Sequence, residues 1–447
     1  MNRDSGVLSG PVTFPGYPPG PGATRNLFEQ LGALDDLRRD VLGAVAQRFA
    51  TYGDFYYNEA AGNVDMYHTC HPDLVQQVMV TQARAFHKRT TDLEVLGNGL
   101  LTSDGEEWRR QRRRIQPGFR HESIQRYASL IADETETLVH SLRDGAVLDL
   151  RKEMMQLTLR IVCRALFGQH FAGRSERLSR AMRVLQEQAL LPKFFPKWVH
   201  SPGNLLRRRM IAEVDREVFP IIDRGGEPGS LLADLLAMTD EEGAMTRQQL
   251  RDEVVTLFLA GHETTALLLT WMGYQLALHP EIDSELGDEL RGTPAELATT
   301  RLSQLPFSER VLNETLRLYP PAYVVPRVCA EPVTLGGYRL APGAEVWIWV
   351  YFVHHDARWF DEPERFRPER FLPEAEAARR PGSFIPFGAG TRTCVGRHFA
   401  MLEALLCMAG LFRRFKLHLV SPRIVRIHPR ITLAPGRPIH VRLEQRR

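Results

Sequence analysis

The sequence predicts a mainly α-helical protein with a smaller β portion, organised as a single domain over residues 27–447. Helical periodicity of apolar residues dominates between about residues 105 and 320. Stretches typical of strands occur before and after that region. No repeat, low-complexity tract or linker indicates a second catalytic domain. Residues 1–26 include a run rich in Pro and Gly and predict an irregular lead-in.

The predicted elements follow the order of the chain. Two stretches, DFYYNE (54–59) and NVDMYH (63–68), predict the first strands. The clearest helical patterns cover residues 121–142, 152–168, 246–278 and 306–319. Beyond these, residues 333–350 predict two strand segments with Gly-Gly and Pro-Gly turns, and residues 397–414 predict a helix. KLHLV (416–420) and IHVRL (439–443) predict closing strands.

The longest predicted helix, residues 246–278, has clear start and stop signals. Thr246 with Gln249 forms a capping box, and His279-Pro280 ends the helix. At 1.5 Å per residue it would be roughly 50 Å long, enough to cross a domain. Its middle is apolar on nearly every face, so we expect it to run through the core.

Composition is that of a soluble globular protein, with 43% hydrophobic and 25% charged residues. The net charge of +3 argues neither for nor against a polyanionic partner. Five cysteines without CxxC spacing favour a reducing compartment. No run of about 18 apolar residues occurs, and the first 26 residues contain no signal-like apolar stretch. We therefore expect a cytoplasmic monomer without a membrane anchor.

An isolated cysteine, Cys394, lies within FGAGTRTCVG (387–396). A cysteine of this kind could be buried filler, a nucleophile or a metal ligand. The glycines at 388, 390 and 396 remove side chains on both sides, so a bulky flat group could approach the backbone. Arg392 adds a positive charge, and a helix starting at about Val395 would lower the thiol pKa.

These features fit a thiolate ligand and also a catalytic cysteine. A nucleophile needs a partnered histidine, and sequence alone does not place His262, His354 or His355 beside the thiol. A zinc site would need more Cys or His ligands than Cys394 with His398.

AGHETT (260–265) interrupts the apolar middle of the long helix. Gly261 costs about 1 kcal/mol relative to Ala inside a helix, and Glu263 needs solvation, a partner or a proton. One interpretation is a kinked helix with a solvated groove. The other is proton delivery to a small bound oxidant, with Thr264 as the hydroxyl and Glu263 as the relay.

Two further motifs are weak by themselves. Glu314 and Arg317 of ETLR share a helix face, and FRPERF (366–371) offers Arg370 as a third member. Five arginines within residues 109–114 could bind nucleic acid or form a solvated helix face. A third possibility is that Trp108 and Arg112 point inward to an anion while the others stay outside.

Together, AGHETT, ETLR, FRPERF and FGAGTRTCVG resemble, in order and spacing, the cytochrome P450 family of haem-thiolate monooxygenases. The resemblance spans about residue 50 to the C-terminus, and the FxxGxRxC loop is highly specific. It implies a mostly helical, roughly triangular single domain that binds haem b. Nucleic acid is then not an expected partner.

The resemblance also implies site residues. Cys394 matches the iron ligand, and Thr264 with Glu263 match the pair that delivers protons. Glu314, Arg317 and Arg370 match a structural triad. The side chains that hold the haem propionates in the family are matched here by Trp108, Arg112 and Arg392. We expect Arg327 and one residue of FHKR (86–89) to contact the propionates as well. Close approach to the haem is expected at Ala260, Gly261, Phe387, Gly388 and Gly396.

The implied reaction inserts one oxygen atom of O2 into an unactivated C–H bond and releases the other as water. Electrons would come from NAD(P)H through a separate ferredoxin or flavodoxin with its reductase, and the surplus arginines of 109–114 would suit an acidic partner. A peroxygenase or a haem-dependent isomerase is the alternative class. Peroxide-using relatives commonly replace the acid–alcohol pair with Arg and Pro, whereas this chain keeps Glu263-Thr264.

The substrate pocket is expected near residues 91–100, 185–200, 258–260 and 322–325, including Phe258, Val324 and Val325. Most of these residues are apolar, so a hydrophobic substrate is expected. AGHETT with ETLRLYPP resembles fatty-acid-hydroxylating members, which makes a fatty acid the first choice. A terpenoid or macrolide-like product is the alternative.

Overall fold

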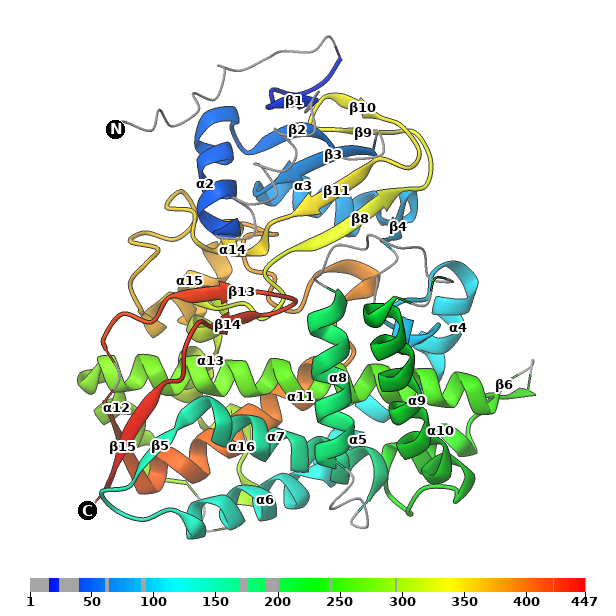
Figure 1. Cartoon of the computed structure of the whole chain (residues 1–447). Helices are drawn as coiled ribbons and strands as arrows, with labels where there is room; N and C mark the ends of the chain where they lie inside the picture. Colours follow the sequence, from blue (N-terminus) through cyan, green and yellow to red (C-terminus); the bar gives the residue numbers. More distant parts are fainter. Residues whose placement is uncertain are drawn as a thin grey trace. The chain divides into compact units, whose positions relative to one another are not determined.

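The computed structural model describes residues 16–23, 40–60, 64–89, 94–168, 175–189, 199, 201–240, 243–293, 296–420 and 422–446. Contacts divide the chain into two compact units (Figure 1). Unit 1 comprises residues 1–89, 322–365 and 373–394, and unit 2 comprises 90–321, 366–372 and 395–447. The single domain expected over residues 27–447 stays a prediction.

Unit 1 is built on a six-stranded sheet with strand order β1-β2-β3-β11-β8-β4. Its strands pair antiparallel except for β1 with β2 and β3 with β11, which are parallel. The bounds are β1 Gly22–Ala23, β2 Phe55–Ala60, β3 Val64–Thr69, β4 Phe86–Lys88, β8 Val325–Cys329 and β11 Glu345–Ile348. A separate hairpin joins β9 Val333–Leu335 to β10 Tyr338–Leu340. The helices are α2 Val41–Tyr52, α3 Pro72–Gln76, α14 Val350–His354 and α15 Pro373–Ala378.

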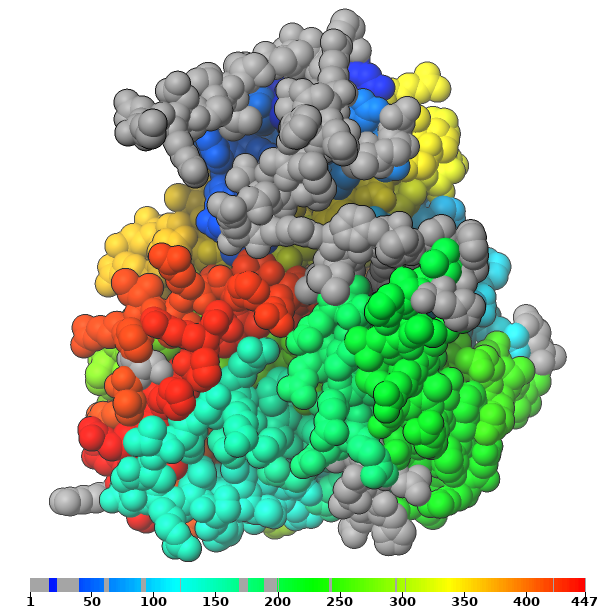
Figure 2. Space-filling model, in the orientation of Figure 1, coloured from blue at the N-terminus to red at the C-terminus, as the bar shows by residue number. Residues whose placement is uncertain are grey.

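Unit 2 is mainly helical. Its helices are α4 Gly105–Ile115, α5 His121–Ile124, α6 Ala128–Ser141, α7 Leu150–Phe167, α8 Ser175–Ala189, α9 Pro202–Asp223, α10 Leu231–Ala237, α11 Arg247–Leu278, α12 Pro280–Arg291, α13 Pro306–Leu318 and α16 Arg397–Arg414. A three-stranded sheet has the order β12-β15-β5, and two hairpins pair β6 with β7 and β13 with β14. These strands are β5 Val147–Asp149, β6 Thr239–Asp240, β7 Gly243–Ala244, β12 Phe415–Leu419, β13 Ile427–Pro429, β14 Leu433–Pro435 and β15 His440–Gln445. Helices α8 and α9 pack side by side on the face seen in Figure 2.

Helix α11 runs through the core of unit 2, as the sequence predicts. Thr246 caps it, and the capping box with Gln249 is present in both directions. Helices α7 and α16 pack against it (Figure 1). By length and composition α11 could also cross a membrane, but 72% of its most apolar window is buried inside the protein. Burial of this kind characterises a core helix.

The mainly helical fold class is confirmed, and three local expectations change. Residues 121–142 form two helices separated by a 3-10 turn, Gln125–Tyr127, instead of one helix. Residues 333–350 contain three strands instead of two, because both predicted turns are present and leave a short strand between them. Part of the lead-in is ordered, since the amide of Tyr57 donates to the carbonyl of Pro19 and β1 extends the sheet edge.

Candidate active site

The Cys394 loop forms a closed turn at the end of unit 1. The backbone amide of Cys394 donates to the carbonyl of Phe387 over 2.9 Å, which brings the two ends of the loop together. Between them lies a 3-10 turn, Gly390–Arg392, and the Thr393 hydroxyl donates to the carbonyl of Gly390. Helix α16 begins at Arg397 with Gly396 as its N-cap, as predicted for residues 397–414 and two residues after the start at about Val395 that the thiol argument used.

The two glycines before the cysteine have different roles. Both have positive φ, +71° at Gly388 and +68° at Gly390, which favours glycine. A Cβ at Gly390 would lie 1.9 Å from the carbonyl oxygen of Met79, so this glycine lets the loop pack on a neighbouring helical turn. A Cβ at Gly388 would meet nothing within 4 Å. The backbone at Gly388 is therefore open to a bulky flat group, whereas Gly390 serves packing.

Cys394 is the exposed cysteine of the five, and the other four are buried. Burial raises the pKa of Cys329 to about 12, and it also raises the pKa values of Cys70, Cys163 and Cys407. Because a thiolate is the form that binds metals, these four thiols are unsuited to the task. Cys394 is the accessible candidate.

Helix α11 continues through AGHETT without a break, but residues within this motif are less buried than the rest of the helix interior. Residues 250–258 and 265–276 are buried, whereas Ala260 is exposed and Gly261, Glu263 and Thr264 are half-buried. A Cβ at Gly261 would lie 3.2 Å from a methyl group of Val162 on α7. Gly261 therefore lets the two helices approach closely, and the exposed residue of this stretch is Ala260.

Glu263 and Thr264 point to different partners. The carboxylate of Glu263 accepts hydrogen bonds from Gln186 Nε2 of α8 (2.8 Å) and from the Thr432 hydroxyl (2.9 Å). The hydroxyl of Thr264 donates to the carbonyl of Ala260, one turn earlier in α11 (2.6 Å). The acid is thus held by two other elements of unit 2, while the alcohol is held by its own helix.

Gln186 and Thr432 are functional candidates that the sequence reasoning missed. Each is an ordinary polar residue outside any motif, and only the fold brings α8 and the β13–β14 hairpin onto Glu263. The unsatisfied carboxyl group predicted at Glu263 was the available signal, since a half-buried carboxylate requires partners.

The expected propionate ligands lie on separate elements. Trp108 and Arg112 are half-buried on α4, one turn apart. Arg392 is half-buried in the Cys394 loop, and Arg327 is buried on β8, where its Nη1 donates to the carbonyl of Pro326. Within FHKR, Arg89 pairs with Glu345 at 2.7 Å. Their contacts with haem stay predictions.

The arginines of α4 do not all face solvent, which corrects the possibility that all those other than Arg112 stay outside. Arg114 is buried, and both it and Arg110 bind the carboxylate of Asp240 in the β6–β7 hairpin. Arg109 pairs with Glu106, and Arg113 is exposed. Arg110 and Arg114 therefore stabilise the fold by joining α4 to the β6–β7 hairpin.

The three residues of the expected triad meet in the interior of unit 2. Arg317 donates from Nε and Nη2 to the two oxygens of Glu314, at 2.7 and 2.8 Å, and both side chains are fully buried. Arg370 Nε and the backbone amide of Arg367 donate to Glu314 at 3.3 and 2.9 Å. One carboxylate thus attaches the segment 366–372 to α13.

The histidines considered as partners of a nucleophile have other partners. His262 donates from Nε2 to the carbonyl of Met155, and burial lowers its pKa to about 4. His354 Nε2 accepts from the amide of Ile385, and His355 Nδ1 donates to the carbonyl of Tyr351. Within the described ranges, no three His, Cys, Asp or Glu side chains cluster as metal ligands.

The expected pocket residues differ in their surroundings. Phe258 is almost fully buried in the core of unit 2, 5.8 Å from the His262 ring, so it has a packing role and its contact with substrate stays a prediction. Val324 and Val325 are half-buried in unit 1. Residues 91–93, 190–198 and 200 lie outside the described residues.

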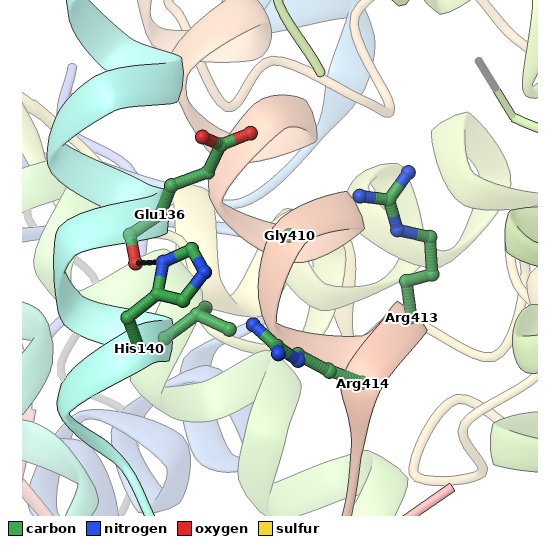
Figure 3. Close-up of a pocket in the computed structure, with 6 residues that line it drawn as sticks. Glu136, His140, Gly410, Arg413 and Arg414 are labelled. Carbon is green, nitrogen blue, oxygen red and sulfur yellow. Dashed lines mark hydrogen bonds between the residues drawn. The ribbon is translucent and has the colours of Figure 1, made fainter. Parts of the chain in front are cut away.

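A separate pocket of about 300 Å³ lies between α6 and α16 (Figure 3). It is lined by Glu136, Val139, His140, Gly410, Arg413 and Arg414. His140 Nδ1 donates to the carbonyl of Glu136 over 2.7 Å. None of the expected site residues lines this pocket.

Glu403 of α16 leads to a prediction about pH. It is fully buried, and burial raises its pKa to about 8, against a smaller opposing effect of Thr265. Between the ordinary pKa near 4.5 and about 8, the folded protein binds more protons than the unfolded chain, so stability falls as pH rises. We expect Glu403→Gln to remove up to about 1.4 kcal/mol of this loss per pH unit.

Urea unfolding of both proteins at pH 5.5, 6.5 and 7.5 measures the difference. Glu253, whose pKa burial also raises to about 8, contributes equally in both and serves as an internal background. Parallel dependences of unfolding free energy on pH would show that Glu403 is not the titrating group.

The residues present fit a haem bound through one thiolate. A single accessible thiol lies beside backbone that carries no side chain, which matches a flat macrocycle with one protein ligand to its metal. Half-buried or buried arginines suit its carboxylates. A zinc site would instead need several Cys or His ligands.

The comparisons with known proteins agree. The family model of cytochrome P450 matches residues 18–440. Cyclooctatin synthase of Streptomyces melanosporofaciens is 35% identical over 395 residues, covering 83% of this chain and 84% of that protein. Pentalenene oxygenase of Streptomyces avermitilis is 31% identical, covering 86% and 89%. Cyclooctat-9-en-7-ol 5-monooxygenase of Streptomyces melanosporofaciens is 32% identical, covering 78% and 80%.

The chain belongs to the cytochrome P450 family. It is a cytochrome P450 monooxygenase, and the cofactor of that family is haem iron.

Proposed function

We propose that this enzyme hydroxylates a cyclic terpenoid, with Cys394 as the iron ligand and with electrons from NAD(P)H delivered by a separate ferredoxin or flavodoxin and its reductase. The observation that carries the proposal is the exposed thiol of Cys394 beside the bare backbone of Gly388. Haem iron, when bound, supplies the chemistry that activates O2 for insertion into a C–H bond.

The roles of the chain's own residues follow from their positions. Cys394 Sγ would hold the iron, and the guanidinium groups of Arg112, Arg327 and Arg392 would hold the two propionates, with Trp108 beside them. The exposed Ala260 and the adjoining Gly261 would leave room for O2 at the bound cofactor.

Proton delivery would use Thr264 and Glu263 in turn. The Thr264 hydroxyl can release its bond to Ala260 and donate toward the oxidant, because a hydroxyl rotates freely. Glu263 would leave Gln186 or Thr432, take up a proton from solvent and relay it to the Thr264 hydroxyl oxygen. The presence of both Glu263 and Thr264 in this chain supports a monooxygenase over a peroxygenase or an isomerase.

The substrate class rests on the relatives. Two of them carry names of cyclic terpenoids, pentalenene and cyclooctat-9-en-7-ol, and a third is named for cyclooctatin. These names support the terpenoid alternative over the fatty acid that the motifs favour. An apolar substrate also suits the half-buried Val324 and Val325.

The bacterial relatives support a cytoplasmic location, and we propose a monomer there.

Turnover of pentalenene, cyclooctat-9-en-7-ol and palmitic acid tests the substrate class when the enzyme is supplied with NADPH, a ferredoxin and its reductase under 18-O2. We expect one labelled oxygen in the product of a terpenoid. Labelled product from palmitic acid alone would contradict the terpenoid assignment. Product that needs only peroxide, or that carries no label, would support the alternative classes.

The exposed arginines of α4 provide a prediction about the redox partner. We expect Arg113→Glu and Arg109→Glu each to slow reduction by an acidic ferredoxin by roughly tenfold at low salt, because charge complementarity raises association rates. The effect should shrink at high salt.

Stopped-flow reduction at several ionic strengths measures these rates. Arg216→Glu is a matched control, since Arg216 is an exposed arginine of α9 that pairs with Glu213 three residues earlier, as Arg109 does with Glu106. Equal slowing by all three changes would reject a docking role for α4.

A further inference from the structure

Three consecutive charged residues at the start of α11 are buried, although they belong to no motif recognised in the sequence. Arg251, Asp252 and Glu253 are 3%, 5% and 0% exposed. Charged side chains are rarely buried to this extent unless they have partners. Each of the three binds a different backbone group of one short segment, residues 95–100.

The contacts follow the segment in order. Arg251 Nη1 donates to the carbonyl of Val95. Asp252 Oδ2 accepts from the amide of Asn98 at 2.9 Å. Glu253 Oε2 accepts from the amide of Leu100 at 3.0 Å. Because all three bonds go to the backbone, they fix the path of the segment directly.

Glycines allow the segment to lie this close to the helix. A Cβ at Gly97 would lie 2.2 Å from Asp252 Oδ2, and Gly97 also has a φ of +53°. A Cβ at Gly99 would lie 2.3 Å from the Thr256 hydroxyl and 2.7 Å from the carbonyl of Asp252. Neither position accepts a side chain without moving the segment away from α11.

Other elements of unit 2 hold the same contacts in place. Arg251 Nε also binds Asp215 of α9 at 2.7 Å. Gln111 of α4 donates to the carbonyl of Asn98 at 2.7 Å. The segment is therefore bonded to α11 and α4, and α9 holds Arg251 in place. Leu96 is fully buried, and Leu100 is partly buried against the core.

We propose that Arg251, Asp252 and Glu253 form a backbone clamp that holds residues 95–100 rigid, and that this segment forms part of the substrate pocket expected near residues 91–100. They act as positioning residues that touch no substrate and determine which large ligands fit. The role at the substrate site rests on the proposed function, whereas the clamp itself rests only on the contacts within unit 2.

Hydrogen–deuterium exchange of the haem-loaded enzyme tests the clamp directly. In Asp252→Ala and Glu253→Ala, the amides of residues 96–101 should exchange roughly tenfold faster or more, because each change removes the acceptor of one amide, that of Asn98 or that of Leu100. Glu253→Gln should behave as wild type, since its amide oxygen still accepts. Burial raises the pKa of Glu253 to about 8, so a neutral group is its ordinary form. Glu285→Ala, an exposed carboxylate of α12, is the matched control.

Gly99→Ala gives a second route that leaves the residues of α11 unchanged. Its Cβ should push the segment off the helix and accelerate exchange as the Asp252 variant does. Unchanged exchange in Gly99→Ala and Glu253→Ala would overturn the clamp, whatever the enzyme oxidises.

Binding of two azoles to the haem iron tests the role in the pocket without knowledge of the substrate. Clotrimazole is bulky and senses the surrounding walls, whereas imidazole binds the iron alone. We expect the clamp variants to change the clotrimazole Kd by roughly threefold to thirtyfold while the imidazole Kd stays constant. Accelerated exchange with both constants unchanged would reject the specificity role. A change in both would place the effect at the haem instead.

Discussion

Replacing Glu314 with alanine will lower the free energy of unfolding by about 3–5 kcal/mol, because it leaves two guanidinium groups without their carboxylate in a buried site. Arg317 is fully buried and binds both oxygens of Glu314, and Arg370 binds one of them. Burial lowers the pKa of Arg370 even with Glu314 present, which shows how poorly solvated this site is.

Asp288→Ala is the matched control. Asp288 pairs with Arg291 at the same three-residue spacing on α12, but both side chains are exposed. An exposed pair contributes about 0–1 kcal/mol, so this change should be nearly silent. Urea unfolding of both variants gives the two values, and equal losses of stability would contradict the structural role of the buried triad.

Thr264→Val should reduce product formation by about 100-fold, since a positioned proton donor typically contributes 10²–10⁴-fold to rate. Valine has the same shape and lacks the hydroxyl that donates to Ala260. Electrons should still be consumed, so the ratio of product to NADPH oxidised is expected to fall sharply.

Thr270→Val separates this effect from a general effect on the helix. Thr270 also lies on α11 and donates to a carbonyl one turn earlier, that of Ala266, at 2.6 Å. It is fully buried within the apolar half of the helix. Product yield should be unchanged in this variant, and equal losses in both would mean that Thr264 acts only through helix structure.

The sequence pattern predicted those helices whose ends depend on interactions within the helix itself. The capping box of Thr246, the apolar length of α11 and the stop at His279 depend on residues within one helix, and the structure has the helix at 247–278. The break between α5 and α6 was not predictable, because residues 121–142 keep a helical pattern through the 3-10 turn. Packing against other elements determines such breaks.

The candidate site likewise contains residues that a local motif predicts and residues that only the fold brings together. The motif around Cys394 could be read from residue types, because glycines, arginine and a lone thiol have few joint uses. The partners of Glu263 could not, since Gln186 and Thr432 are 77 and 169 residues away in sequence. The paired use of Arg110 and Arg114 likewise depends on Asp240, which lies more than a hundred residues along the chain.

The most direct test of the central claim is the absorption spectrum of the dithionite-reduced enzyme with carbon monoxide. If Cys394 is the iron ligand, the wild-type protein will give the strongly red-shifted Soret band of thiolate-ligated haem. Cys394→His will lose that band, while Cys407→Ser, a change at a buried thiol, will keep it. A red-shifted band that persists in Cys394→His, or a wild-type protein without one, would contradict the assignment of Cys394.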